Sequence, residues 1–105
     1  MAHKILYNVT VKVLNEFSEE WLQWMQEVHI PDVMATSKFE EYKISEIIEE
    51  ENEGRTFAIQ YVAPDMDTFQ SYQLEHVKGL QQEHATRYKD KYVAFRTLMN
   101  IIKEG

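Results

Sequence analysis

A chain of 105 residues with 44% hydrophobic composition is long enough for one compact domain with its own core, and we expect residues 1–105 to form it. The formal net charge of −7 disfavours binding to the phosphates of nucleic acids, and the lack of cysteine excludes disulfides, a thiol nucleophile and thiolate metal ligands. We see no signal peptide and no apolar run near the roughly 20 residues that a membrane span needs, so we expect a cytoplasmic protein without a membrane partner.

The first third of the chain predicts a strand and then an amphipathic helix. Residues 4–14 alternate, with one apolar face made of Ile5, Tyr7, Val9, Val11 and Val13. After Ser18, which we expect to be the N-cap, apolar residues recur at helical spacing: Trp21, Trp24, Met25 and Val28. Pro31 cannot continue this helix without cost, so we expect a kink or break there, with His29 at a helix end and a short helical piece starting at Pro31.

The remainder predicts a hairpin, a long helix and a last strand. Residues 39–50 and 55–63 are rich in β-branched and aromatic side chains, and "ENEG" between them offers Gly54 for a turn with positive φ. Asp65 or Asp67 can cap a helix through about residue 88. One side of this helix is expected to carry Phe69, Tyr72, Gln73, His76, Val77, Leu80, His84 and Arg87. Residues 91–102, "KYVAFRTLMNII", alternate as a strand.

The resulting order, β-α-β-β-α-β, predicts an α+β ferredoxin-like fold: an antiparallel four-stranded sheet with both helices on one face. The other face of the sheet has no helix of its own. Large apolar residues nevertheless occur on both faces of the last strand, with Phe95 and Met99 on one and Tyr92 and Leu98 on the other. Because monomers rarely expose large apolar patches, we expect a homodimer in which a second copy covers this face.

RNA-recognition domains share this topology, and "RTFAIQY" at 55–61 resembles their third-strand motif in Phe57, Ala58 and Tyr61. The motif's glycine is replaced by Thr56 and its next aromatic residue by Ile59. The neighbouring strand is strongly acidic, which opposes binding to phosphates. We therefore expect no nucleic-acid partner.

A broader resemblance is to the dimeric α/β-barrel superfamily, particularly its ethyl-tert-butyl-ether-degradation type and antibiotic-biosynthesis-monooxygenase branches. In these branches an aromatic residue is followed by His and Pro at the end of the first helix, as Trp24, His29 and Pro31 are here. The segments "ILYNVTV", "WLQWMQEVHIPDV" and "VAFRTL" also resemble an uncharacterised domain-of-unknown-function family over residues 4–102. The superfamily implies a head-to-head dimer whose sheets form a barrel. In many members, a pocket between sheet and helices holds an aromatic or polyketide-like metabolite or a haem.

The candidate catalytic residues are His29 and Asp32. His29 can act as a proton shuttle near neutral pH, with Asp32 orienting its imidazole, on an enolisable or aromatic substrate bound against Trp24 and Tyr7. A structural alternative is equally concrete. A histidine at a helix end can bond the exposed carbonyls, and an acid suits the first turn of the short helix after Pro31.

The candidate ligand-binding residues are aromatic or basic groups on apolar faces: Tyr7, Trp24, Tyr61, Tyr72, His76 and Arg96. The guanidinium of Arg96 needs an acidic partner, which a ligand or a carboxylate of the chain can supply. For the tyrosines and Trp24, the alternative is ordinary packing in the core. Eight residues of helix, about 12 Å, separate His76 from His84, so they cannot share one metal ion, and we expect no metal site and no cofactor.

Haem-degrading members of the superfamily pair a first-strand Asn, a Trp and a helix His. Asn8, Trp21 or Trp24, and His76 supply these types here, although Asn8 alternates out of phase with the apolar face of its strand. Haem binding is thus one alternative function. Another is a purely structural or interaction module.

Our main functional expectation is a dimeric barrel that binds a small apolar or aromatic metabolite and can transform it without a cofactor. An open cavity with convergent His, Tyr and Arg groups favours this reading. A filled core with His29 bonded to backbone carbonyls favours the structural module instead.

Overall fold

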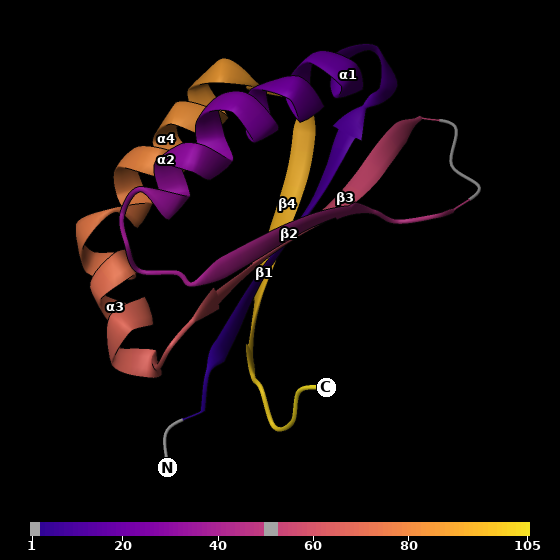
Figure 1. The fold of residues 1–105 in the computed structure, drawn as a ribbon. Helices are drawn as coiled ribbons and strands as arrows, with labels where there is room; N and C mark the ends of the chain where they lie inside the picture. The colour runs from indigo at the N-terminus through magenta and orange to yellow at the C-terminus, as the bar shows by residue number, and fades with distance from the viewer. Residues whose placement is uncertain (1–2, 50–52) are drawn as a thin grey trace.

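The structure is a computed structural model that describes residues 3–49 and 53–105. The elements are β1 (Ile5–Leu14), α1 (Asn15–Trp24), the π-helical turn η1 (Met25–His29), α2 (Ile30–Met34), β2 (Glu41–Glu46), β3 (Gly54–Ala63), α3 (Met66–Glu75), α4 (Val77–Arg87) and β4 (Tyr92–Asn100). The strands form a sheet of order β2-β3-β1-β4 in which every neighbouring pair is antiparallel. The helices lie on one face of this sheet (Figure 1), which confirms the predicted ferredoxin-like α+β fold. In the described ranges, no helix is long and apolar enough to span a membrane.

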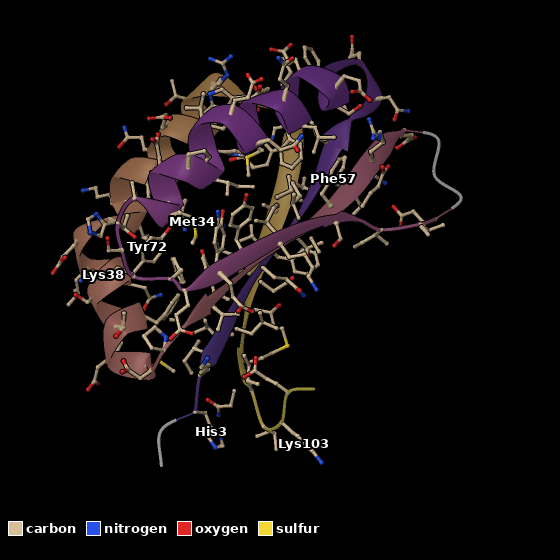
Figure 2. The ribbon with its side chains drawn as sticks, viewed as in Figure 1. His3, Met34, Lys38, Phe57, Tyr72 and Lys103 are labelled. Carbon is tan, nitrogen blue, oxygen red and sulfur yellow. The ribbon has the colours of Figure 1, made fainter. Side chains whose placement is uncertain are left out.

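The alternation of β1 decides which side chains enter the core. Ile5, Tyr7, Val11 and Val13 are buried on the face that the helices cover. Because β1 pairs with β3 and β4, their matching positions share that face: Tyr61 lies opposite Tyr7, and Arg96 lies opposite Val9. The core therefore occupies the layer between sheet and helices, from Phe57 near one end to Tyr72 near the other (Figure 2).

The start of α1 differs from the prediction. The helix begins at Asn15, so Ser18 lies inside its first turn and is not the N-cap. The Ser18 hydroxyl donates to the Asn15 carbonyl at 2.9 Å and accepts from Arg55 Nη1 at 3.2 Å. Ser18 is buried because it helps to anchor Arg55, which also pairs with Glu46 and Glu19.

The helix does not end at His29, as we had expected, but widens there into the π turn η1. The Ile30 N–H bonds to the Met25 carbonyl, five residues back, and helical backbone continues into α2 with Pro31 in its first turn. Proline lacks an N–H and its ring crowds the carbonyl four residues earlier, so a wider turn relieves the clash. Each residue of a π turn advances by less than the roughly 100° of an α-helix. Val28 is consequently 38% exposed, and it is His29 that lines the interior.

The hairpin forms as predicted, but Gly54 has a different role in it. β2 is shorter than the predicted segment and pairs with β3 between Glu41–Glu46 and Phe57–Val62. Gly54 does not have the positive φ that we expected of it. It opens β3 opposite Leu14, where an added Cβ would lie 2.7 Å from the Val13 carbonyl oxygen, so close approach of two backbones requires glycine. The rest of the predicted "ENEG" turn lies partly outside the described residues.

The predicted long helix is two helices, α3 and α4, which meet at His76, where φ is −127°. The carboxylate of Asp65 caps α3 by accepting the Thr68 N–H at 2.8 Å, as predicted. Phe69, Tyr72 and His84 are buried, whereas Gln73 and Arg87 are exposed, contrary to the prediction. These two positions lie at the margins of the inner stripe, where a long polar side chain reaches solvent.

Candidate functional site

Two clusters of rings occupy the layer between the sheet and the helices. The first contains Tyr7, Phe39, Tyr61, Phe69 and Tyr72, with ring centroids as close as 4.7 Å between Phe39 and Tyr72. The second contains Trp21, Trp24, His29, His84, Tyr88 and Tyr92, with His84 and Tyr92 in edge contact at 4.3 Å. Every side chain of the two clusters except Phe39 and Phe69 carries a polar nitrogen or hydroxyl group.

A narrow pocket lies between the clusters. Its walls are Tyr7, Val9, Val11, Met25, His29, Val33, Ile59, Tyr61, Tyr72, Leu80, Gln81, His84, Ala94 and Arg96. The cavity has a volume of about 40 Å³, whereas an apolar cavity that holds benzene measures about 150 Å³. The space as it stands accommodates water-sized groups. A ring-sized ligand requires wall residues that are not fully buried, such as Leu80, Gln81 and Arg96, to move.

His84 has a fixed tautomer. The buried indole N–H of Trp21 donates to His84 Nε2 at 2.9 Å, so Nε2 carries the lone pair and the ring proton is on Nδ1. Burial, with help from the nearby His29 and Arg96, lowers the pKa of His84 to about 4. At neutral pH His84 is therefore an uncharged group that presents an N–H donor from Nδ1.

His29 contains an unpaired polar atom. Its Nδ1 is buried and has no hydrogen-bond partner in the part of the chain that the structure describes. The ring packs against Trp24, with centroids 5.2 Å apart, and lies 5.7 Å from His84. Burial lowers the pKa of His29 to about 4, opposed by the charge of Asp32 and aided by that of Arg96. Buried polar atoms are nearly always paired, so an orphan nitrogen on a pocket wall is unusual.

Arg96 brings a positive charge to the pocket. Within residues 3–49 and 53–105 it has no ion-pair partner. Glu46, one carboxylate of the chain that could have served, is bound by Arg55 through two hydrogen bonds of 2.9 Å. Arg96 is exposed on β4, yet its charge helps to lower the pKa values of His29 and His84 and opposes the rise in the pKa of Tyr72. Arg96 lines the same pocket as all three rings.

Two pocket tyrosines, Tyr61 and Tyr72, stay protonated. Burial, reinforced by the neighbouring tyrosines, raises the pKa of Tyr61 above its ordinary value. Burial also raises the pKa of Tyr72, helped by Tyr7 and opposed by Arg96. Their hydroxyls are therefore neutral groups of the pocket, which can donate or accept hydrogen bonds.

The structure brings five of the eight predicted site residues together: Tyr7, His29, Tyr61, Tyr72 and Arg96 all line the pocket. Trp24 supports the pocket from behind, through its contact with the His29 ring. His76 lies at the junction of α3 and α4 beside Glu75, outside the pocket walls. Asp32 is exposed on α2 and influences His29 through its charge, without a hydrogen bond to it.

The residues considered for haem do not form one site. Asn8 lies on the face of β1 opposite to the pocket, where its amide donates to Thr10 Oγ1 at 3.0 Å. The Trp21 N–H is occupied by His84, and His76 is outside the pocket. These residues therefore do not fit a haem. Among the described residues, no group of three or more metal-ligating side chains gathers at one point.

Sequence reasoning placed His84 on the inner side of its helix but did not select it as a site residue. What makes His84 a site residue is its hydrogen bond to Trp21, which is 63 residues away in the chain. No local sequence pattern predicts such a contact. Gln81 was missed because it sits beside the predicted apolar stripe. Its spacing of three residues from His84 is the only local signal that could have found it.

Residues 4–102 match the family described as a domain of unknown function, DUF4286. A search of curated proteins found no match. Among solved structures, a dimeric ferredoxin-like protein from an uncultured marine organism superposes with a TM-score of 0.73 at 9% identity, covering 98% of this chain and 99% of the other.

An EthD-like protein from Ralstonia eutropha JMP134 has a TM-score of 0.73 at 13% identity, covering 100% of this chain and 97% of the other. SnoaB, a cofactor-independent oxygenase from Streptomyces nogalater, has a TM-score of 0.63 at 14% identity, with 98% and 97% covered. Identities this low show a shared fold and nothing more. The predicted likeness to these branches is confirmed at that level, and the family match over nearly the whole chain is decisive: the chain belongs to the DUF4286 family.

Proposed function

We propose that this protein binds a small apolar or aromatic metabolite in the pocket between its sheet and helices. The observation that carries the proposal is the unpaired, buried Nδ1 of His29 on a wall made mainly of apolar and aromatic side chains. An orphan polar atom costs about 1–3 kcal/mol in a folded protein, so its retention is explained when a ligand supplies the missing partner. The alternative of a purely structural histidine predicted bonds from His29 to backbone carbonyls, and Nδ1 makes none.

The size of the cavity limits how the ligand enters. A ring does not fit into about 40 Å³, so binding opens the wall formed by Leu80, Gln81 and Arg96. Leu80 and Gln81 lie on α4 just after the break at His76. His76 departs from helical φ, although its N–H still bonds to the Tyr72 carbonyl and its own carbonyl accepts from the Leu80 N–H, so widening the pocket takes a small pivot of the first turn of α4 at His76.

The proposal extends to chemistry on an enolisable or aromatic substrate. His29 is unprotonated at neutral pH and therefore free to accept a proton from a bound ligand. Because the pKa of His29 is low, its protonated imidazole gives the proton up again readily. The negative charge of Asp32 stabilises that imidazolium while it exists. If His29→Ala keeps full ligand affinity and any turnover that is detected, this role is refuted.

We also propose that the protein is a cytoplasmic homodimer. On the face of β4 that points away from the helices, Val93 is 67% exposed, Phe95 64% and Met99 39%. This apolar strip suits a second copy of the chain, since monomers seldom leave such a strip uncovered. Sedimentation of the wild type and of Phe95→Lys tests it: a dimer that the substitution converts to monomer is expected, and a wild type that is monomeric at micromolar concentration contradicts it.

Binding is tested with three isosteric probes, benzoate, benzamide and benzamidinium, titrated while protein NMR spectra are recorded. We expect at least one probe to shift the signals of His29, Tyr7 and Tyr61. Ala94→Leu adds bulk on the pocket wall and should abolish the shifts. Ala58→Leu, which adds the same bulk on the opposite face of the sheet, is the matched control and should leave them intact. Failure of all three probes with the wild type contradicts the proposal.

A further inference from the structure

The charges around the pocket are asymmetric in a way that its aromatic character does not explain. The chain has 18 acidic residues, yet none of them is among the described residues that line the pocket, whereas Arg96 does line it. Arg96 has no carboxylate partner within the described ranges. A guanidinium beside an apolar cavity and without a counterion favours a ligand that brings the negative charge itself.

A second donor belongs to His84, which lines the same pocket. The indole N–H of Trp21 donates to His84 Nε2, which leaves the ring proton of His84, a residue only 7% exposed, on Nδ1. Among the described residues, none accepts a hydrogen bond from that N–H. His84 therefore cannot offer a lone pair to the pocket while the bond to Trp21 persists, and the ligand atom that it meets must be an acceptor.

From these two donors we infer that the pocket selects a ligand with an oxyanion, a carboxylate or a phenolate oxygen attached to a planar apolar body, held by Arg96 and His84 Nδ1–H. This inference deepens the proposed function and rests on it. The cavity of about 40 Å³ suits the anionic group, while the planar body takes the space made by the movement of Leu80 and Gln81. His29, whose tautomer no protein contact fixes at Nδ1, can donate to a second oxygen or accept from a neighbouring hydroxyl.

The overall charge of the protein acts against this selection. A net charge of −7 repels anions at long range, and an anion loses hydration on entering the pocket. At physiological ionic strength the screening length is about 8 Å, so the distant acids count for little. The local balance is between Arg96, which lines the pocket, and Asp32, which does not line it but acts on His29. A preference for anions in such an acidic protein must therefore arise locally.

The three probes used above have the same shape and differ in charge, so they test the inference directly. Charge-assisted hydrogen bonds should make benzoate bind about tenfold more tightly than benzamide, and benzamidinium more weakly than either. Arg96→Met should remove the advantage of benzoate over benzamide, so that the ratio of the two affinities falls to about one. Arg96→Lys should restore part of it. Arg87→Met removes the same charge from a site outside the pocket lining, above the ring of Trp24, and should leave the ratio of the benzoate and benzamide affinities unchanged.

A second arm identifies the source of the oxyanion. 4-Nitrophenol absorbs differently as phenol and phenolate, so its spectrum reports the form that is bound. Capture of the phenolate with higher affinity than benzoate assigns a phenolate ligand, and the reverse order assigns a carboxylate; both support the inference. Equal affinity for benzoate and benzamide overturns it while the proposed function stands. Absence of binding by every probe refutes the proposed function as well.

The tautomer of His84 is measured on the wild-type protein, because a substitution at this buried residue could prevent folding. Long-range ¹H–¹⁵N NMR spectra of the imidazoles show which nitrogen carries the proton. We expect His84 to be protonated at Nδ1 at neutral pH. A proton on Nε2 would show that the donor is not available to the ligand and would overturn the role of His84.

Discussion

Lowering the pH should destabilise this protein through its two pocket histidines. In the folded state the pKa values of His29 and His84 lie at about 4, against an ordinary value of 6.5. As the pH falls, these two histidines therefore bind protons near pH 6.5 in the unfolded chain but only near pH 4 in the folded protein. The stabilisation that the neutral rings provide is complete above pH 6.5 and is lost as the pH falls towards 4.

The size of the loss follows from the shifts. One pKa unit corresponds to about 1.4 kcal/mol, so a single histidine with this shift costs about 3 kcal/mol of the free energy of unfolding at acid pH. The rings are 5.7 Å apart and part of the shift of His84 is due to His29, so the two effects are not additive. Together they should remove about 3–5 kcal/mol, which is a large share of the stability of a small domain.

Urea unfolding, followed by tryptophan fluorescence at constant protein concentration, gives the free energy of unfolding between neutral pH and about pH 4. The difference between the wild type and His29→Gln isolates the histidine from the carboxylates, which titrate in both. His76→Gln removes a histidine outside the pocket and serves as the control. If the wild type and His29→Gln lose stability in parallel over this range, burial does not perturb His29 and the reasoning fails.

Further substitutions test single contacts by urea unfolding. Trp21→Phe should cost about 1–3 kcal/mol for the unpaired His84 nitrogen, in addition to the cost of the lost volume, and a loss below about 0.5 kcal/mol would contradict the bond. Gly54→Ala should destabilise the protein by more than about 1 kcal/mol because the new methyl meets the Val13 carbonyl oxygen at 2.7 Å. Gly79 lies inside α4, and a Cβ added there would have no atom within 4 Å, so Gly79→Ala should raise the free energy of unfolding by about 0.5–1 kcal/mol. A lower free energy of unfolding would contradict open space at this position.

Local patterns in the sequence predicted most of the fold. The alternation in β1, the cap at Asp65 and the order of elements all depend on residues close in the chain, and the structure has them. The failures concern positions where tertiary contacts outweigh local preference. Ser18 resembles an N-cap but is buried against Arg55, and Gly54 resembles a turn residue but is required where two backbones approach.

The candidate site was predictable in composition but not in its connections. The alternation of strands placed Tyr7, Tyr61 and Arg96 on one face, because strand period and pairing fix the facing side. The bond between Trp21 and His84 joins the first and last helices, and the burial of His29 depends on the helix that covers it. A sequence without alignment carries no signal for such long-range pairs.

The π turn connects the sequence motif with the pocket. If the α-helix ended at His29, its side chain would be in contact with solvent and would bond to the free carbonyls of the last turn. This was the structural alternative. Because Pro31 is accommodated by the wider turn, helical backbone passes His29 without a free end, and those carbonyls are not available to it. The imidazole is instead turned into the layer between helix and sheet, against Trp24, with Nδ1 unpaired. π turns interrupt helices at a cost in stability and occur frequently at functional sites. The spacing of Trp24, His29 and Pro31 thus has a physical explanation. The wider turn accommodates Pro31, and it directs the His29 side chain into the layer between helix and sheet. There the imidazole packs against the ring of Trp24.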